Sequence, residues 1–344
     1  MARRTRLKNR RDDAATASVT AAYVKRDLPF FDPLNPDVVA GLETQVDWIL
    51  QEVGIAFRDD PKALEIWRKA GVKPEGDLIK APADWIRALC RKAPSEFTQR
   101  ARNPERSVRI GGAHQVFAPI YGAPFVRDLK QGRRYGDLDS FTKLVKLVQM
   151  LPSLHHSGLV IVEPCDVPVS KRHLDMVYAH MRYTDKPHLG AITEQSRAQD
   201  SVDMAEILHG KEAMDTQCVI LGNVNTNSPL LVDKVVSEAI RTYCGQGIIV
   251  VPFILSGAMG PVSTAASIAQ AMAEAMICCA FSQLVREGAP FVLGNFLSSM
   301  SLKSGAPTFG MPEPVLSNYV IGQMARRIGL RLRCGGSLTA SKIE

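Results

Sequence analysis

The stretch GIIVVPFILS, residues 247–256, is continuously apolar and rich in β-branched residues. Such a run is typical of a strand buried on both faces of a parallel sheet, because half-exposed strands alternate apolar and polar residues. Similar runs begin at His156, Lys186, Gln217, Pro290 and Leu330. Successive runs start 30, 31, 30, 43 and 40 residues apart, and about 30 residues is the length of one strand–helix unit. The sequence therefore predicts repeated βα units with six visible strands.

Two architectures are built from such units: an open doubly wound sheet and a closed (β/α)8 barrel. A doubly wound nucleotide-binding sheet would carry a Gly-x-Gly-x-x-Gly turn or a Gly-Lys-Ser/Thr phosphate loop, and this sequence contains neither. The predicted strand ends instead carry different polar residues in every repeat, which is how barrel enzymes distribute an active site. We therefore expect an α/β fold of the TIM-barrel type.

The count of six strands leaves two of the eight barrel strands unassigned. Either an earlier segment, such as Phe125–Leu129, enters the barrel, or the chain is a fragment that lacks the last units. We expect the fragment, with an unpaired strand edge at residues 330–336.

The region before the barrel has a different pattern. Residues 37–93 show apolar residues at helical spacing, and residues 107–135 show β-hairpin patterns punctuated by glycine. We therefore expect three regions: a basic tail over residues 1–13, a helical region closed by a small β layer over 14–135, and the barrel over 136–344.

The composition is that of an ordinary globular protein, with 46% hydrophobic and 22% charged residues in 344. The formal net charge is +7, but the first 11 residues contain six Lys and Arg, so the rest of the chain carries only +1. The basicity therefore belongs to a tail, and we expect no nucleic-acid partner.

The sequence also indicates the cellular compartment. The tail lacks the apolar segment of a secretory signal. The longest apolar stretch, Ser263–Arg286, is interrupted by Gln270, Glu274 and Gln283, so we expect no membrane span. The seven cysteines are scattered and odd in number, which favours free thiols in a reducing cytoplasm.

In a barrel, the active site lies at the carboxyl ends of the strands. Glu163 and Glu194 follow two of the predicted strands and are candidate catalytic acids or partners for a cation. The alternative is that they cap the next helix or pair with Arg172 or Arg197.

Two asparagines, Asn223 and Asn225, are two positions apart, so both face the barrel axis if either does. They are further candidate catalytic residues, although an interior amide can simply satisfy neighbouring backbone groups. Metal binding is not predicted, because the histidines and cysteines lack the spacing of a metal site.

The loop SGAMGPVST, residues 256–264, is a candidate anion site. Gly257 and Gly260 permit close approach of the backbone, and Ser263 or Thr264 can cap the following helix. Free amides at a helix N-terminus bind carboxylates or phosphates. The alternative is a tight turn that only lets the long helix pack.

Several longer motifs resemble one known family, the trimethylamine methyltransferase family. They are VPFILSGAMGPVSTAASIAQAMAEAMICCAFSQLVREGAPFVLGNF (251–296), KSGAPTFGMPEP (303–314), FVRDLKQGRRYGDLDSF (125–141) and VIVEPCDVPVSKRHLDMVYAH (160–180). The resemblance implies a (β/α)8 barrel that transfers a methyl group from a methylated amine to the cobalt of a separate corrinoid protein. It also implies that relatives continue beyond residue 344.

Trimethylamine-using members of that family carry pyrrolysine, which is not present here. The resemblance therefore implies a quaternary amine, such as glycine betaine, with trimethylamine as the alternative. A quaternary nitrogen needs no acid to become a leaving group, and it binds to aromatic faces. Tyr121, Phe253 and Phe296 are the candidate aromatic residues, with Asn295 beside them as a further substrate-binding candidate.

We expect no tightly bound cofactor, a corrinoid protein as partner, and possible self-association. The alternative function is a barrel lyase or aldolase acting on a small carboxylate. Its Schiff-base form needs a lysine within a strand, whereas Lys186 opens its strand at the wrong end. A third possibility is an inactive, truncated member of the family.

Overall fold

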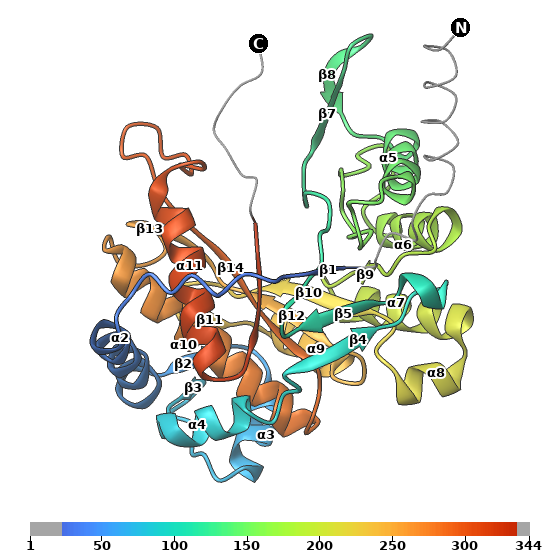
Figure 1. Cartoon of the computed structure of the whole chain (residues 1–344). Helices are drawn as coiled ribbons and strands as arrows, with labels where there is room; N and C mark the ends of the chain where they lie inside the picture. Colours follow the sequence, from blue (N-terminus) through green and yellow to red (C-terminus); the bar gives the residue numbers. More distant parts are fainter. Residues whose placement is uncertain (1–22, 336–344) are drawn as a thin grey trace, which may run out of the picture.

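Three helices form the first part of the fold in the computed structural model, which describes residues 23–335 (Figure 1). They are α2 (Pro36–Trp48, extended by the turn Ile49–Val53), α3 (Pro61–Lys69) and α4 (Ala83–Cys90). Proline occupies the first turn of α2 and α3, and the side chains of Asn35 and Asp60 cap their free amides. The predicted helical region is therefore observed. The basic tail, residues 1–13, lies outside the described residues.

Short strands accompany these helices. One antiparallel sheet has the order β1-β6-β5-β4, from Val24–Lys25, His114–Gln115, Val108–Gly111 and Glu96–Gln99. A second has the order β11-β2-β3, from Leu231–Val232, Ile55–Phe57 and Leu78–Ile79. The hairpin of β7 (Phe125–Asp128) and β8 (Gly132–Tyr135) projects from the body in Figure 1. Of these strands, β5, β6, β7 and β8 lie within residues 107–135, where the sequence predicts hairpins, and the others lie outside that stretch.

The centre of the fold is a parallel sheet whose strands are neighbours in chain order. It contains β9 (Leu189–Gly190), β10 (Leu221–Asn225), β12 (Ile248–Val251), β14 (Phe291–Ser299) and β15 (Arg331–Cys334). All four pairings are parallel. Each strand begins within four residues of a predicted start, so the sequence analysis was right for five of the six runs.

The run from residue 247 to 256 forms two strands rather than one. Strand β13 (Phe253–Ser256) continues β12 in the same register along β14, with Ile248 opposite Phe291 and Phe253 opposite Phe296. Pro252 separates the two strands because it has no N–H to donate to a ladder.

The sixth predicted strand, at residues 156–163, is not a regular strand. Ser157 N donates to Pro187 O (2.8 Å) and Leu189 N to Gly158 O (2.9 Å), which continues the parallel array beside β9. Gly158 then adopts a positive φ of 72°, and Val162 instead bridges Ala123. A single left-handed residue thus redirects the segment. Phe125–Asp128 belongs to the hairpin and does not enter the sheet.

Helices accompany the parallel sheet, and most of those that follow β9 contact its strands. The accompanying helices are α5 (Leu138–Met150), α6 (Arg172–Tyr183), α7 (Gln195–His209), α8 (Lys211–Thr216), α9 (Lys234–Tyr243), α10 (Thr264–Val285) and α11 (Pro312–Arg327). Helix α10 is long and apolar enough to cross a membrane, but nearly all of it is buried within the fold. It contacts α2, α4, α9, α11 and β14, so its hydropathy reflects a central position in the core.

Alternate residues of the strands belong to two different hydrophobic clusters. Ile248, Val250 and Leu293 pack with the covering helices, whereas Ile249, Val251 and Val292 face the opposite side and form part of a second cluster. We call this second side the interior face. The fold is thus of the α/β class, and its central strands are parallel, as predicted. Within residues 23–335 they form an open array and not a closed eight-stranded barrel.

Candidate functional site

The interior face carries polar side chains from strands that are not neighbours. Asn223 lies in the middle of β10, and Arg333 lies on β15, three strands away in the sheet. Nevertheless, Arg333 Nη1 lies 3.5 Å from Asn223 Oδ1. The sheet is therefore curved enough to bring its two sides together around this point.

Tyr121 completes this group, which we call the interior cluster (Tyr121, Asn223 and Arg333). Its backbone neighbour Gly122 donates to Val160 O at 2.7 Å, which holds Tyr121 beside the segment 156–163. The guanidinium of Arg333 lies 5.8 Å from the ring centroid. Burial raises the pKa of Tyr121, while a hydrogen bond with Asn223 opposes this shift. The hydroxyl therefore stays protonated at neutral pH. Asn225, next along the same face of β10, is exposed at the rim.

Aromatic side chains gather just beyond the carboxyl end of β12, where β13 begins, and in the second half of β14. The rings of Phe253 and Phe296 are stacked with centroids 5.1 Å apart, and Phe309 lies 5.5 Å from Phe296. We call these three residues the aromatic cluster. Two of them were predicted from the sequence. Phe309 was not predicted, because it lies in the loop after β14. The signal that could have identified it is its place in the motif GAPTFG.

The two candidate acids are paired with arginines. Glu163 Oε1 accepts from Arg172 Nη1 at 2.6 Å, and Glu194 Oε2 lies 3.2 Å from Arg197 Nε. These are the pairings given above as the alternative to a catalytic role. Glu163 still influences its surroundings, since its charge contributes to the raised pKa of Tyr121.

Asn295 lies next to Phe296 but faces the other side of the sheet. Its Nδ2 donates to Asn318 Oδ1 at 2.7 Å and to Ser317 Oγ at 3.2 Å, both on α11. The alternation of β14 places Gly294 and Phe296 on the interior face and Asn295 on the helical face. The side chain of Asn295 thus ties a strand to its covering helix.

The candidate anion loop forms a tight turn. Gly257 N donates to Gly260 O (3.1 Å) and Pro261 O (3.2 Å), and Met259 N donates to Leu255 O (2.8 Å). These amides are therefore already used. Ser263 stands at the N-cap of α10 without capping it through its side chain, and Thr264 is the first helical residue. Any anion here would meet only the first turn of α10.

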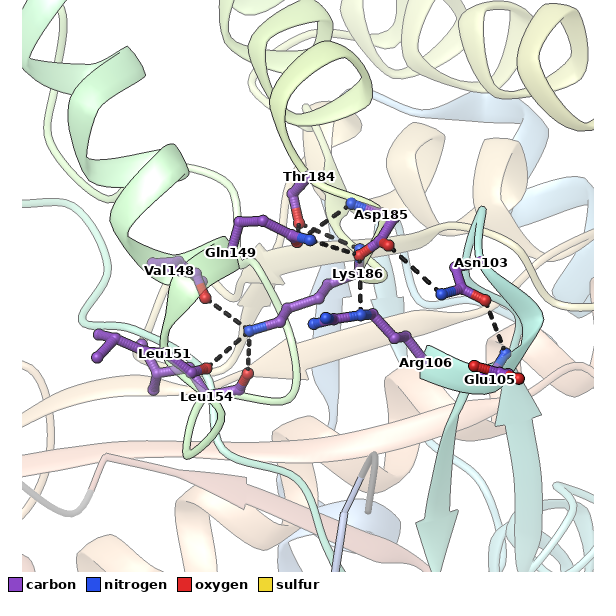
Figure 2. A network of polar contacts seen from close by, with 10 residues as sticks. All are labelled: Asn103, Glu105, Arg106, Val148, Gln149, Leu151, Leu154, Thr184, Asp185 and Lys186. Atoms are coloured by element: carbon purple, nitrogen blue, oxygen red, sulfur yellow. Dashed lines mark hydrogen bonds and ion pairs between the residues drawn. The ribbon is translucent and has the colours of Figure 1, made fainter. Parts of the chain in front are cut away.

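Lys186 is the lysine on which the aldolase alternative depends. Figure 2 shows its ammonium pointing at three carbonyl oxygens, those of Val148 (2.6 Å), Leu151 (2.8 Å) and Leu154 (2.7 Å). Burial lowers the pKa of Lys186 to about 8, so it remains mostly protonated at pH 7. A Schiff-base lysine must be neutral and reach the substrate. Lys186 instead caps the end of α5, which argues against an aldolase.

Among the described residues, no group of three or more His, Cys, Asp or Glu is close enough to hold a metal ion. The cysteines of this part of the chain are free thiols.

The comparisons with known proteins identify the family. The family model for trimethylamine methyltransferase (MTTB) matches residues 2–344. The chain belongs to the trimethylamine methyltransferase family. This confirms the resemblance that the motifs indicated.

Two relatives in the family have names that specify substrates. The chain is 35% identical to the glycine betaine methyltransferase of Desulfitobacterium hafniense (strain Y51), over 92% of this chain and 66% of that protein. It is 25% identical to the proline betaine:corrinoid methyltransferase of Eubacterium limosum, over 83% of this chain and 61% of that protein. The chain thus spans somewhat less than two thirds of the length of these relatives.

A solved structure is also similar to the chain. It is the monomethylamine methyltransferase of Methanosarcina barkeri, with 12% sequence identity and a TM-score of 0.41, over 87% of this chain and 79% of that one.

Proposed function

We propose that this chain transfers a methyl group from a quaternary amine, such as a betaine, to the Co(I) of a corrinoid carried by a separate protein. The observation that carries the proposal is the aromatic cluster. Three neighbouring phenylalanine rings just beyond the carboxyl end of β12 offer π faces in the region where a barrel enzyme binds its substrate. Family membership and the names of the relatives support the same reaction.

The proposed methyl transfer requires no general acid or base from the protein. When the methyl carbon is transferred, the electron pair of its bond to nitrogen stays with nitrogen, which leaves as a neutral tertiary amine. The nitrogen starts with a positive charge, so no proton has to be supplied. The electrons for the new bond come from the corrinoid of the partner. The chain therefore needs to bind the cation, exclude water and aim one methyl group at the partner.

The remaining candidate residues fit supporting roles in this proposal. Asn223 and Tyr121 hydrogen-bond to each other on the interior face and act as positioning residues there. Asn225 lies at the exposed rim of the same face. Glu163 adds negative charge close to the site, although Arg172 largely balances it. We further propose that the curved parallel sheet is part of a (β/α)8 barrel, since its strands follow one another in chain order as barrel strands do.

A spectroscopic assay tests the function. The chain is mixed with a reduced corrinoid protein and glycine betaine, and the absorbance spectrum of the corrinoid is followed. Methylation of Co(I) is expected with glycine betaine and much less with trimethylamine. Demethylation of glycine betaine in the absence of any corrinoid protein would overturn the mechanism. A spectrum that stays unchanged with every methylated amine would overturn the function.

A further inference from the structure

Arg333 lies on the interior face and has no carboxylate partner among residues 23–335. Three other largely buried arginines each have one: Arg87 lies 2.5 Å from Asp47, Arg172 lies 2.6 Å from Glu163, and Arg241 pairs with Asp60. For Arg333, the described residues provide only Asn223 Oδ1 at 3.5 Å and the ring of Tyr121.

The positive charge of this partly buried guanidinium is only partly balanced by its neighbours. Water is removed from a charge that no opposite charge balances, which costs free energy. Desolvation accordingly lowers the pKa of Arg333, although the group remains protonated at any physiological pH. The site is therefore prepared for an anion, and the planar guanidinium matches a carboxylate with two parallel hydrogen bonds.

The register of the sheet places Arg333 close to the aromatic cluster. Arg333 is opposite Gly294 on β14, and Phe296 is two residues further along the same face. Two residues of strand and one strand spacing separate the Cα atoms of Arg333 and Phe296 by about 8 Å. Gly294 contributes no side chain of its own between them, and the side chain of Val251 on β12 packs closely against its Cα. A short zwitterion, with a carboxylate at one end and a quaternary nitrogen at the other, would therefore reach both groups.

We propose that Arg333 binds the carboxylate of the substrate while the aromatic cluster binds its ammonium group. Arg333 is then the residue that selects betaines over quaternary amines without an acid group. The inference rests on the proposed function, since it specifies which amines enter the same site. Asn223 and Tyr121 hold the guanidinium in place through the contacts given above.

Ligand binding by calorimetry tests the proposal without requiring methyl transfer. Glycine betaine and tetramethylammonium are titrated into the wild type, Arg333→Gln and Arg333→Lys. Arg333→Gln is expected to bind glycine betaine about 10- to 150-fold more weakly, with tetramethylammonium binding unchanged. Arg333→Lys is expected to be intermediate, because it keeps the charge and loses the two parallel hydrogen bonds.

Arg331→Gln is the matched control. Arg331 lies two residues earlier on the same strand and the same face, and it donates to the carbonyl of Ser95 in the small β layer. This variant is expected to keep the wild-type affinity for both ligands. Circular dichroism and thermal melting establish that each variant is folded.

The outcomes separate the two proposals. If both ligands bind equally well to the wild type and to Arg333→Gln, the carboxylate role is wrong and the proposed function stands. Loss of both ligands in a folded Arg333→Gln variant would show a structural role and also overturn the inference. If neither ligand binds to the wild type, the proposed function fails and the inference fails with it.

Discussion

Ser228 Oγ, in the loop after β10, donates a hydrogen bond of 2.6 Å to Glu274 Oε2, in the middle of α10. The same carboxylate accepts from Thr226 Oγ1 at 2.5 Å, from Leu230 N at 2.9 Å and from Gln270 Nε2 at 2.9 Å. Glu274 is completely buried. The most apolar helix of the fold thus uses one acid to hold the loop that follows the rim residue Asn225.

Replacing Glu274 should destabilise the fold. In Glu274→Gln, one oxygen acceptor becomes a donor group that faces the hydroxyls of Thr226 and Ser228 or the amide of Leu230. We expect a loss of about 1–3 kcal/mol in the free energy of unfolding, measured by urea denaturation. Glu65→Gln is the control, because Glu65 is exposed on α3 and pairs with Lys69 at the surface, so its effect on stability should be small. Equal stability of both variants would contradict the role of Glu274.

Replacing Lys186, which caps the end of α5, should also destabilise the fold. In Lys186→Met, the three carbonyl oxygens of Val148, Leu151 and Leu154 lose their common donor. We expect a loss of about 2–4 kcal/mol in the free energy of unfolding, since several buried acceptors are left unpaired. Borohydride treatment with a small keto acid should trap no adduct on Lys186. A trapped adduct would instead revive the aldolase alternative.

Three buried histidines should make the fold sensitive to acid. Burial lowers the pKa of His156 to about 3, that of His180 to about 3 and that of His188 to about 4. His156 Nδ1 accepts from Gly158 N at 2.8 Å, which favours the neutral form. His180 Nε2 donates to Leu159 O at 2.8 Å, a bond that raises the pKa of His180 but is outweighed by burial, and its Nδ1 lies 2.6 Å from Ser157 Oγ.

The direction of the pH dependence follows from these shifts. Between about pH 6.5 and 4, the unfolded chain binds protons at these histidines and the folded chain does not, so stability falls as the pH falls. Three such groups give a slope of up to about 4 kcal/mol per pH unit. His156→Gln should reduce this slope by about one third, measured by urea denaturation from pH 7 to 4.5. An unchanged slope would mean that His156 is not buried in its neutral form.

The order of the parallel strands was predictable because it depends on local pattern. Continuous apolar runs such as residues 247–256 are typical of strands buried on both faces. The spacing between the runs indicates the length of each strand–helix unit. The irregular segment at 156–163 was not predictable, since the positive φ of Gly158 depends on its partners across the sheet.

The site was predictable only in part, because it depends on register. Phe253 and Phe296 follow from their places at strand ends. The sequence LRLRC gives no sign that Arg333 meets Asn223, three strands away, because that contact exists only in the curved sheet. The alternation of a strand already predicts that Asn295 and Phe296 point in opposite directions, but which of them meets α11 depends on packing.

Asn295→Ala should affect stability and leave ligand binding intact. The change removes the hydrogen bonds to Ser317 and Asn318 that connect β14 with α11. We expect a loss of about 1–3 kcal/mol in the free energy of unfolding. The affinity for glycine betaine, measured by calorimetry below the melting temperature, should equal that of the wild type. A selective loss of affinity would move Asn295 into the binding site.

Phe296→Ala tests the aromatic cluster itself. Phe296 is the central ring, with Phe253 on one side and Phe309 on the other. A contact between a quaternary nitrogen and an aromatic face is worth about 0.5–2 kcal/mol, so binding of glycine betaine should weaken about 2- to 30-fold. Phe309→Leu keeps most of the apolar volume and removes only a ring, so a comparable loss there would attribute the effect to the π face, whereas a much weaker loss would attribute it to packing. If Phe296→Ala binds glycine betaine as tightly as the wild type, the cation lies elsewhere on the interior face and the methyl-transfer proposal still stands.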